Sequence, residues 1–405
     1  MRILFICQKP PYPASDGASV VMKVNIESFI DAGCEVSALI LSTQKHAGSL
    51  QDIPLKIREK AHFYFAEIDT SFGILGVAKN LLFSHLPFHV ERFDKKEVHE
   101  KLKEILAENN FDIIQLEGLY LTSYVPTIRT FSQAKIVYRA HNLEQEIWRR
   151  QAEKESHFLK KIYLKNLTKR HESYEWACLK GHFYEAITTL SPRDEAVMRE
   201  NRVTLPILTA SFGVNMGDLK IDNAIFPEKD SLFFLGAMDW QPNIAAVEWF
   251  VAEVWDKIRA KHPQLKCYIA GRNMNPTFLA HKNEKDNIFK IGEVPDAHLF
   301  MQSKNIMIVP LLAGGGIRIK LIEGMALGKA IVASSIALEG NPARNRQEVL
   351  IADSPNDFAA AVCELIEKPD FAHKLAKNAQ IHARQHFDNK VLADKLLHFY
   401  GMSEK

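Results

Sequence analysis

Apolar runs of strand length alternate with helix-length segments along the chain, a pattern typical of parallel α/β sheets. In the first half, the runs predict strands at residues 3–7, 35–41, 62–67, 112–116, 135–138 and 186–190. A helix is expected over 19–31, where Gly33 stops it in the manner of a C-terminal helix cap. A longer helical region is expected from about residue 143 to 180.

After residue 215 the chain turns polar as far as residue 230, and the alternation then restarts. It predicts strands at 232–235, 266–270, 288–292, 306–310 and 330–334, and helices over 244–260 and 297–302. Two similar α/β halves joined near residue 215 predict two Rossmann-like domains facing each other across a cleft, the first at 1–214 and the second at 215–387. In such sheets, ligands bind outside the carboxyl ends of the strands.

Composition narrows the class of protein. A chain of 405 residues can hold two cores, and a net charge of +2 gives no sign of a nucleic-acid partner. The five cysteines are scattered singly without zinc-site spacing, so no metal ligands are expected and a reducing cytoplasm is the simplest compartment. No apolar run reaches the length of a membrane span, and residues 3–7 read as a buried strand rather than a signal peptide.

The most informative segment follows the strand at 306–310 and leads into a helix. It reads Gly314-Gly315-Gly316-Ile317-Arg318-Ile319-Lys320. The glycines allow a close backbone approach, and the free N–H groups at a helix start attract an anion. Arg318 and Lys320 add positive charge where a diphosphate would lie, and Glu323 can accept hydrogen bonds from ribose or sugar hydroxyls. These features predict a sugar-nucleotide site; the alternative is an ordinary turn, with Lys320 and Glu323 forming a surface pair.

Two positions in the first half are further candidates. Gly17 stands where the first loop enters its helix, and its N–H group could face a phosphate or the reacting sugar. The alternative there is that Asp16 or Ser19 simply caps the helix. His141 follows the strand that ends at residue 138 and would point into the cleft, unless it is incidental to a helix cap made by Asn142.

The second half holds two more junctions between a strand and a loop. The first contains Gly236, Trp240 and Asn243, in which Trp240 could stack on a base and Asn243 could cap the next helix. The second contains Gly271 and Arg272, which could touch a base or form an ordinary turn.

Two segments favour contact with a membrane surface as strongly as they favour an ordinary solvated helix. Residues 158–170 are basic and interleaved with apolar and aromatic residues, and 72–88 are apolar with Lys79 as the only charge.

Taken in order, these motifs resemble the GT4-type retaining glycosyltransferases of the GT-B architecture. The resemblance is carried by the Gly-rich strand–loop–helix, by the run from Glu323 to Lys329 and by Glu339-Gly340, and more loosely by Gly17 and His141. It implies metal-independent transfer, without a cofactor, from a nucleotide-diphospho-sugar to a glycan or lipid-linked acceptor in cell-surface polysaccharide or glycoconjugate synthesis. It also implies that the last helix, within 388–405, packs back on the first domain.

The resemblance assigns roles to individual residues. Arg318 and Lys320 would bind the diphosphate, Glu323 the ribose, and His141 the donor sugar. Gly17 would approach the phosphate or the acceptor, and the nucleotide would also contact Gly236, Trp240, Asn243, Gly271, Arg272, Gly315, Gly316, Ile317 and Ile319. Many members carry a glutamate where this chain has Gly315, so N–H groups there would replace a carboxylate.

Three alternatives remain at this stage. One is a sugar-nucleotide epimerase of the same architecture, and another is a non-catalytic sugar-nucleotide-binding protein. A dinucleotide oxidoreductase is disfavoured because the first loop lacks the GxGxxG fingerprint.

Overall fold

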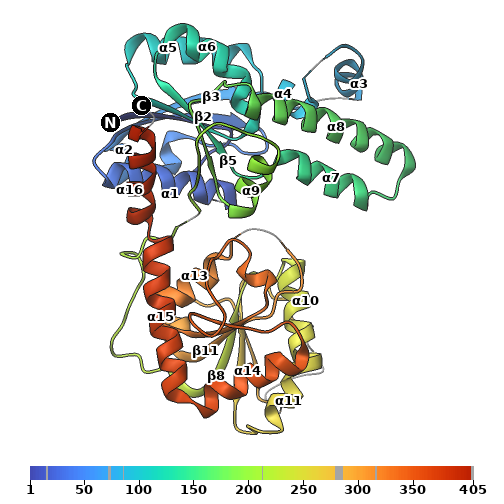
Figure 1. The fold of residues 1–405 in the computed structure, drawn as a ribbon, viewed down its shortest axis with the longest axis vertical. Helices are drawn as coiled ribbons and strands as arrows, with labels where there is room; N and C mark the ends of the chain where they lie inside the picture. The colour runs from blue at the N-terminus through green and yellow to red at the C-terminus, as the bar shows by residue number, and fades with distance from the viewer. Residues whose placement is uncertain are drawn as a thin grey trace. The chain divides into compact units, whose positions relative to one another are not determined.

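The computed structural model describes residues 1–14, 17–71, 74–84, 86–211, 213–278, 286–314 and 317–402. The chain forms two units, each with its own sheet and core (Figure 1). Unit 1 comprises Met1–Phe212 together with Leu392–Lys405, and unit 2 comprises Gly213–Val391. Among the described residues, no helix is long and apolar enough to cross a membrane.

Unit 1 is built on a parallel sheet of seven strands in the order β3-β2-β1-β4-β5-β6-β7. The strands are β1 (Arg2–Cys7), β2 (Glu35–Thr43), β3 (Ala61–Ile68), β4 (Ile113–Glu117), β5 (Lys135–Ala140), β6 (Ala186–Thr189) and β7 (Ile207–Thr209). Six of them were predicted from the sequence. The last was missed because a three-residue edge strand carries too little periodicity to be recognised.

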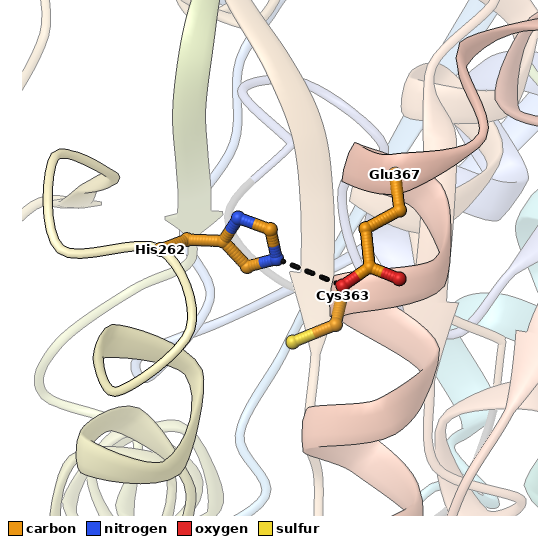
Figure 2. A group of neighbouring side chains, drawn as sticks. All are labelled: His262, Cys363 and Glu367. Carbon is orange, nitrogen blue, oxygen red and sulfur yellow. Dashed lines mark ion pairs between the residues drawn. The ribbon is translucent and has the colours of Figure 1, made fainter.

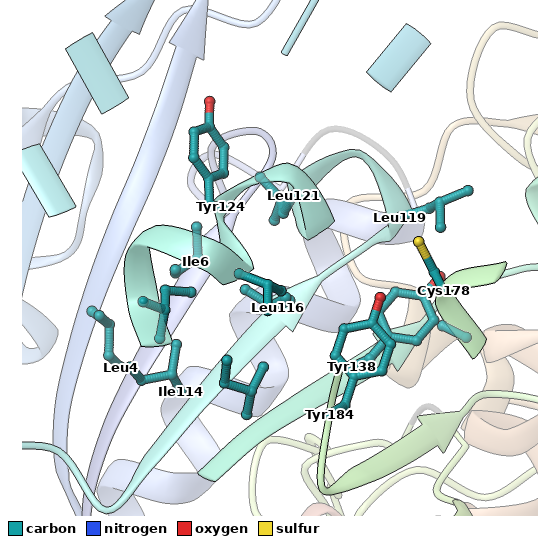
Figure 3. Packing of buried hydrophobic residues seen from close by; sticks show 14 of the residues in the cluster. Leu4, Ile6, Ile114, Leu116, Leu119, Leu121, Tyr124, Tyr138, Cys178 and Tyr184 are labelled. Atoms are coloured by element: carbon teal, nitrogen blue, oxygen red, sulfur yellow. The ribbon is translucent and has the colours of Figure 1, made fainter. Parts of the chain in front are cut away.

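Helices cover both faces of this sheet (Figure 1). The helices of unit 1 are α1 (Gly17–Asp31), α2 (Leu55–Arg58), α3 (Ile74–Phe83), α4 (Phe88–Glu91), α5 (Lys96–Glu108), α6 (Val125–Phe131), α7 (Glu144–Lys154), α8 (Phe158–Lys180), α9 (Pro192–Glu200) and α16 (Asn389–Met402). One face packs its core under α5 and α6, where Leu116, Tyr124 and Tyr138 are buried (Figure 3). The other face packs under α1 and α16, where the rings of Phe29 and Tyr400 stack at 5.9 Å.

The helical region expected over 143–180 folds as two helices, α7 and α8. The break falls between Lys154 and Phe158, where the Glu155 carboxylate accepts a hydrogen bond from the His157 backbone N–H at 3.0 Å. His157 then caps α8 through its ring, which accepts from the Lys160 N–H. A polar residue whose side chain bonds to nearby backbone groups offers them an alternative to continuing the helix.

Unit 2 contains a parallel sheet of six strands in the order β10-β9-β8-β11-β12-β13. They are β8 (Glu228–Leu235), β9 (Lys266–Ala270), β10 (Ile288–Gly292), β11 (Lys304–Val309), β12 (Ala330–Ala333) and the unpredicted two-residue β13 (Leu350–Ile351). Its helices are α10 (Gln241–Trp249), α11 (Trp255–Arg259), α12 (Ala297–Gln302), α13 (Ile319–Ala326), α14 (Pro355–Glu367) and α15 (Pro369–Phe387). The helix expected over 244–260 is interrupted by a π-helical turn at Phe250–Val254.

The strand orders decide where ligands can bind. In unit 1 the order reverses between β1 and β4, and in unit 2 between β8 and β11. At such a switch point the two connecting loops leave toward opposite faces of the sheet and open a crevice at the carboxyl ends of the strands. The predicted loops that contain Gly17, Gly236 and Gly314 follow β1, β8 and β11 and therefore lie at these two points.

Candidate active site

The Gly-rich loop leads from β11 into α13, as the sequence predicted. Gly314 has φ +110, which favours glycine, and a Cβ there would lie 3.0 Å from Arg318 Nη2. Arg318 is the N-cap residue of α13, and its side chain does not cap the helix. Gly315 and Gly316 lie outside the described residues. Gly324 brings α13 against β11, since a Cβ there would lie 2.4 Å from Met307 Sδ.

A cavity of about 600 Å³ opens at the switch point of unit 2. The predicted residues that line it are Gly236, Trp240, Asn243, Gly271, Arg272, Ile317, Arg318, Ile319 and Lys320. Glu293 and Val294 of the loop after β10 also line it, together with apolar side chains that include Met307, Val309 and Leu311. The structure therefore brings together, in one pocket, loops from four strands that are far apart in the sequence.

Backbone contacts between the loops after β8, β9 and β10 shape one wall of the pocket. A Cβ on Gly271 would lie 1.6 Å from the carbonyl oxygen of Gly236, so no larger residue fits at that position. The Gly271 N–H donates to the Gly292 carbonyl at 2.7 Å, and the Gly236 N–H donates to the Ala270 carbonyl at 3.1 Å. These glycines allow a backbone approach that packs three loops tightly.

Asn243 does not cap α10, since it lies inside that helix. Its side-chain amide instead donates to the Ala237 carbonyl at 2.9 Å and ties the loop after β8 to the helix. Trp240 occupies the N-cap position and leaves 58% of its surface exposed while it lines the pocket. An exposed indole at the rim of an apolar pocket is suited to stacking on a planar ring.

Two of the cationic residues that line this pocket, Arg318 and Lys320, lie in different settings. Burial lowers the pKa of the half-buried Arg318, and the nearby charge of Glu339 opposes that shift. Lys320 is more exposed, and its Nζ lies 2.7 Å from Glu323 Oε2. Glu323 also lies 3.6 Å from His298 Nε2 and is not among the residues that line the pocket. The ion pair with Lys320 is the arrangement expected if Glu323 belongs to a helix-surface pair, so its role toward ribose stays a prediction.

In unit 1, His141 comes directly after β5 and is buried. Its Nε2 lies 2.7 Å from Oε2 of Glu117, the last residue of β4. Asn142 does not cap α7, because the Glu175 carboxylate accepts hydrogen bonds from the N–H groups of Glu144 and Gln145. The alternative to a functional His141 was a helix cap made by Asn142, but Glu175 accepts these N–H groups instead.

Gly17 is the first residue of α1, and Asp16, its possible cap, lies outside the described residues. A Cβ on Gly17 would meet no atom within 4 Å, and its φ is not in the left-handed region. Neither space nor backbone conformation requires a glycine there, and the approach of Gly17 to a ligand stays a prediction.

Sequence reasoning missed Glu117. Burial acts to raise the pKa of its carboxyl, but the hydrogen bonds from His141 and Gln115 and the charge of Arg139 act against burial, and the pKa lies below its usual range. The available signal was a carboxylate at the end of an otherwise apolar strand. Such a residue is rarely buried unless it has partners.

One cluster in unit 2 offers metal-ligating atoms. His262, Cys363 and Glu367 place one nitrogen, one sulfur and one oxygen within 4.8 Å of one another (Figure 2). His262 Nε2 lies 3.3 Å from Glu367 Oε1. The cluster shares no residue with the 600 Å³ cavity, and scanning cysteine and histidine spacings could not find it because His262 is far from the other two in sequence.

Comparison with known proteins decides the family. Residues 229–368, which contain the pocket loops and α13, match the family model described as glycosyl transferases group 1. This segment is that of a group 1 glycosyltransferase, a family of enzymes that use nucleotide-sugars. The two parallel sheets form the GT-B fold of the solved structures described below. The family and fold inferred by resemblance are confirmed.

Solved structures resemble this glycosyltransferase along its whole length. Sucrose-phosphate synthase from Thermosynechococcus elongatus is 16% identical with a TM-score of 0.64, covering 99% of each chain. TarM is 12% identical with a TM-score of 0.66, again covering 99% of each chain. Anabaena HepE, solved with UDP-glucose, is 14% identical with a TM-score of 0.58, covering 99% of this chain and all of its own.

A curated relative by sequence is an uncharacterized 44.6 kDa protein in the cps region of Klebsiella pneumoniae. It is 20% identical over 96% of this chain and 97% of its own length.

The ion pair of Glu323 with Lys320 leads to a first prediction. If Glu323 holds ribose hydroxyls, Glu323→Ala weakens binding of a nucleoside diphosphate by about 10- to 100-fold, the effect of losing a charged hydrogen bond. Calorimetry with UDP, GDP and ADP measures this, and Arg346→Ala, which removes a charge paired with Glu364 outside the pocket, is the control. Unchanged affinity for the nucleotide that binds would assign Glu323 to the pair with Lys320 alone.

Proposed function

We propose that this enzyme is a retaining glycosyltransferase that moves a hexose-type sugar from a nucleotide-diphospho-sugar to a glycan or lipid-linked acceptor. The supporting observation is the pocket in unit 2, where Arg318 and Lys320 stand at the start of α13 beside the glycine loops. The N-terminal N–H groups of a helix and two cations are suited to a diphosphate. The apolar wall and Trp240 provide for a base.

The chemistry follows from the charge that develops in the reaction. The bond between the anomeric carbon and the diphosphate oxygen breaks, and its electron pair stays on that oxygen. The acceptor hydroxyl oxygen bonds to the anomeric carbon from the same face, and its proton passes to the departing phosphate oxygen. Arg318, Lys320 and the α13 N–H groups stabilise the growing negative charge, which is the largest contribution in reactions of this kind. No catalytic carboxylate pair is then required.

We take a uridine diphosphate sugar as the first candidate donor. Support comes from two of the similar proteins. HepE was solved with UDP-glucose, and a Staphylococcus aureus TarM variant with UDP. For the acceptor, the Klebsiella relative lies in the cps region, which supports a role in surface polysaccharide synthesis.

A donor panel tests the proposal directly. Thermal shift with UDP-, GDP- and ADP-sugars identifies the donor, because a ligand that binds only the folded state raises its stability. Consumption of that donor is then followed with and without lipid-linked and glycan acceptors. Transfer that depends on the acceptor, with the anomeric configuration retained by NMR, is the expected result. Donor turnover without an acceptor would point to an epimerase, and binding without turnover to a non-catalytic protein.

Removal of Arg318 tests the diphosphate assignment. Arg318→Ala should lower kcat/KM by roughly 30- to 1000-fold, since losing a charged contact to a developing negative charge costs about 2–4 kcal/mol. Lys320→Ala should act in the same direction. Arg346→Ala serves as the matched control, because Arg346 pairs with Glu364 rather than lining the pocket. Near wild-type kcat/KM in both pocket variants would show that the diphosphate binds elsewhere.

Chelation provides an independent test. We expect activity to survive EDTA, because two cations and the helix N–H groups can neutralise the diphosphate without a metal ion. The measurement is the initial rate before and after EDTA, followed by addition of Mg²⁺ or Mn²⁺. Complete loss that either ion restores would contradict the proposed mechanism.

We also propose that the surface formed by α3 and the start of α8 binds an anionic bilayer. Leu82 and Phe83 at the end of α3 are 72% and 78% exposed, and Phe158 at the start of α8 is 72% exposed. The Arg170 guanidinium of α8 donates to Asn80 Oδ1 at 2.9 Å and to the Leu86 carbonyl at 2.7 Å, so α3 is held to the middle of α8.

Basic side chains accompany these exposed apolar residues. They are Lys79, Lys160, Lys161, Lys165 and Lys169. Apolar side chains that enter the interface and lysines that face lipid headgroups are the two features of peripheral binding. A lipid-linked acceptor would be met at such a surface.

Vesicle sedimentation measures this binding. The wild type should sediment with vesicles containing phosphatidylglycerol more than with pure phosphatidylcholine, and less as salt rises, because salt screens charge. Phe83→Ser combined with Phe158→Ser should abolish the difference. Phe226→Ser is the control, since Phe226 is 86% exposed but belongs to unit 2. Equal sedimentation of all proteins with both lipids would rule out this surface.

A further inference from the structure

A buried series of hydrogen-bonded polar side chains in unit 1 ends at His141. The hydroxyl of Tyr400 on α16 donates to Gln115 Oε1, and the Gln115 amide donates to Glu117 Oε1. The second carboxylate oxygen of Glu117 is the one that lies 2.7 Å from His141 Nε2. Gln115 and Glu117 are both fully buried, and Tyr400 is 1% exposed.

The pleat of the sheet explains why these residues meet. Gln115 and Glu117 are two residues apart on β4 and therefore share one face of the sheet. Glu117 lies opposite Arg139 of β5 in the strand register, and His141 follows Arg139 by two residues. This is the face on which α1 and α16 pack, which brings Tyr400 within reach of Gln115.

The hydrogen-bond roles follow from the charge of Glu117. Its pKa lies below the usual range, so the carboxyl is ionised near neutral pH and can only accept. Nε2 of His141 must then carry the hydrogen. The buried guanidinium of Arg139, which donates to the Ala210 carbonyl at 3.1 Å, supplies the opposite charge that a buried carboxylate needs.

The other ring nitrogen is in a different situation. Nδ1 of His141 is buried and has no hydrogen-bond partner among the described residues. A buried polar atom left without a partner destabilises the folded state, so its presence calls for an explanation. A ligand hydroxyl that donates to Nδ1 would satisfy it.

We propose that Glu117 is the positioning residue that holds His141 as the Nε2–H tautomer and so leaves Nδ1 to accept a hydrogen bond from a sugar hydroxyl, with Gln115 and Tyr400 holding Glu117 in turn. The proposal rests on the sugar-transfer function proposed above. Glu117 acts through the imidazole and touches no substrate. Orienting partners of this kind fix both the tautomer and the ring position of a functional histidine.

The tautomer can be measured without any assay of activity. In protein labelled with ¹⁵N-histidine, long-range proton–nitrogen spectra distinguish Nε2–H from Nδ1–H, and His141→Gln assigns the signals of His141. The wild type should show the Nε2–H form. A wild-type ring with a hydrogen on Nδ1, as the Nδ1–H tautomer or as the imidazolium, would overturn the proposal whether or not the enzyme transfers sugar. Absence of transfer with every donor would instead overturn the proposed function and leave the tautomer result standing.

Variants test the consequence for turnover. Glu117→Gln offers an amide that can donate to the ring, so the Nε2–H signal should be lost and kcat should fall by roughly 10- to 100-fold, while the KM for the donor changes little. Tyr400→Phe should lower kcat in the same direction by roughly 2- to 10-fold, the effect of one hydrogen bond. Tyr184→Phe is the matched control. Tyr184 is a buried tyrosine of unit 1 that stacks on Tyr138 and does not belong to the hydrogen-bonded series from Tyr400 to His141. It should keep wild-type kcat.

Two further results would overturn the proposal. One is a folded Glu117→Gln enzyme with wild-type kcat and an unchanged His141 tautomer. The other is a Tyr400→Phe enzyme that matches Tyr184→Phe in kcat and in the His141 signals, and this test remains decisive if Glu117→Gln fails to fold.

Discussion

The parallel direction of every strand pair in both sheets is the constraint on which the rest of this enzyme depends. Because all strands of a sheet run the same way, their carboxyl ends lie along one edge, and every loop that carries a candidate residue leaves from that edge. Where the strand order reverses, adjacent loops part and leave room for a ligand. The pocket beside Arg318 forms at the reversal between β8 and β11, and the pair of His141 and Glu117 lies beside the reversal between β1 and β4.

In unit 2, glycines allow the loops at the carboxyl edge of the sheet to pack closely, each glycine for a different physical reason. Gly271 has no room for a side chain because the Gly236 carbonyl occupies that space, and Gly324 lets α13 lie against Met307. Gly314 combines a positive φ with contact to the Arg318 guanidinium. Three loops and a helix start are thereby drawn around one cavity, which is lined by Arg272, Arg318, Lys320 and the indole of Trp240.

In unit 1, the candidate residues at the carboxyl edge of the sheet are buried polar groups instead of glycines. A carboxylate inside a protein is stable only with hydrogen bonds and a compensating charge, and Glu117 has both, from Gln115, His141 and Arg139. The free-energy cost of removing these polar groups from water is offset by the hydrogen bonds that they make to one another. These hydrogen bonds also give the His141 ring one defined orientation. Through Tyr400, the last helix of the chain takes part in that orientation.

The amino-acid sequence by itself determined the elements and the family. The alternation of apolar strands and helices gave the parallel α/β class, and the segment from Gly314 to Glu323 indicated a sugar-nucleotide site, because strand, glycine loop and helix start are neighbours in sequence. The second-half candidates outside the loop follow strands, so their position at the ligand edge could be inferred from parallel topology alone. The π-helical turn and the break between α7 and α8 were not predicted. The break is accompanied by local hydrogen bonds of Glu155 and His157, which leave the apolar pattern of the sequence unchanged.

Only the tertiary structure decided which side chains meet. It placed Asn243 against the Ala237 carbonyl, and His262 beside Cys363 and Glu367. It also joined Tyr400 to Gln115, 285 positions away in the chain. Sequence patterns record which face of an element is buried, whereas a hydrogen bond between distant residues depends on strand register and helix packing, and these are fixed only when the whole sheet has assembled.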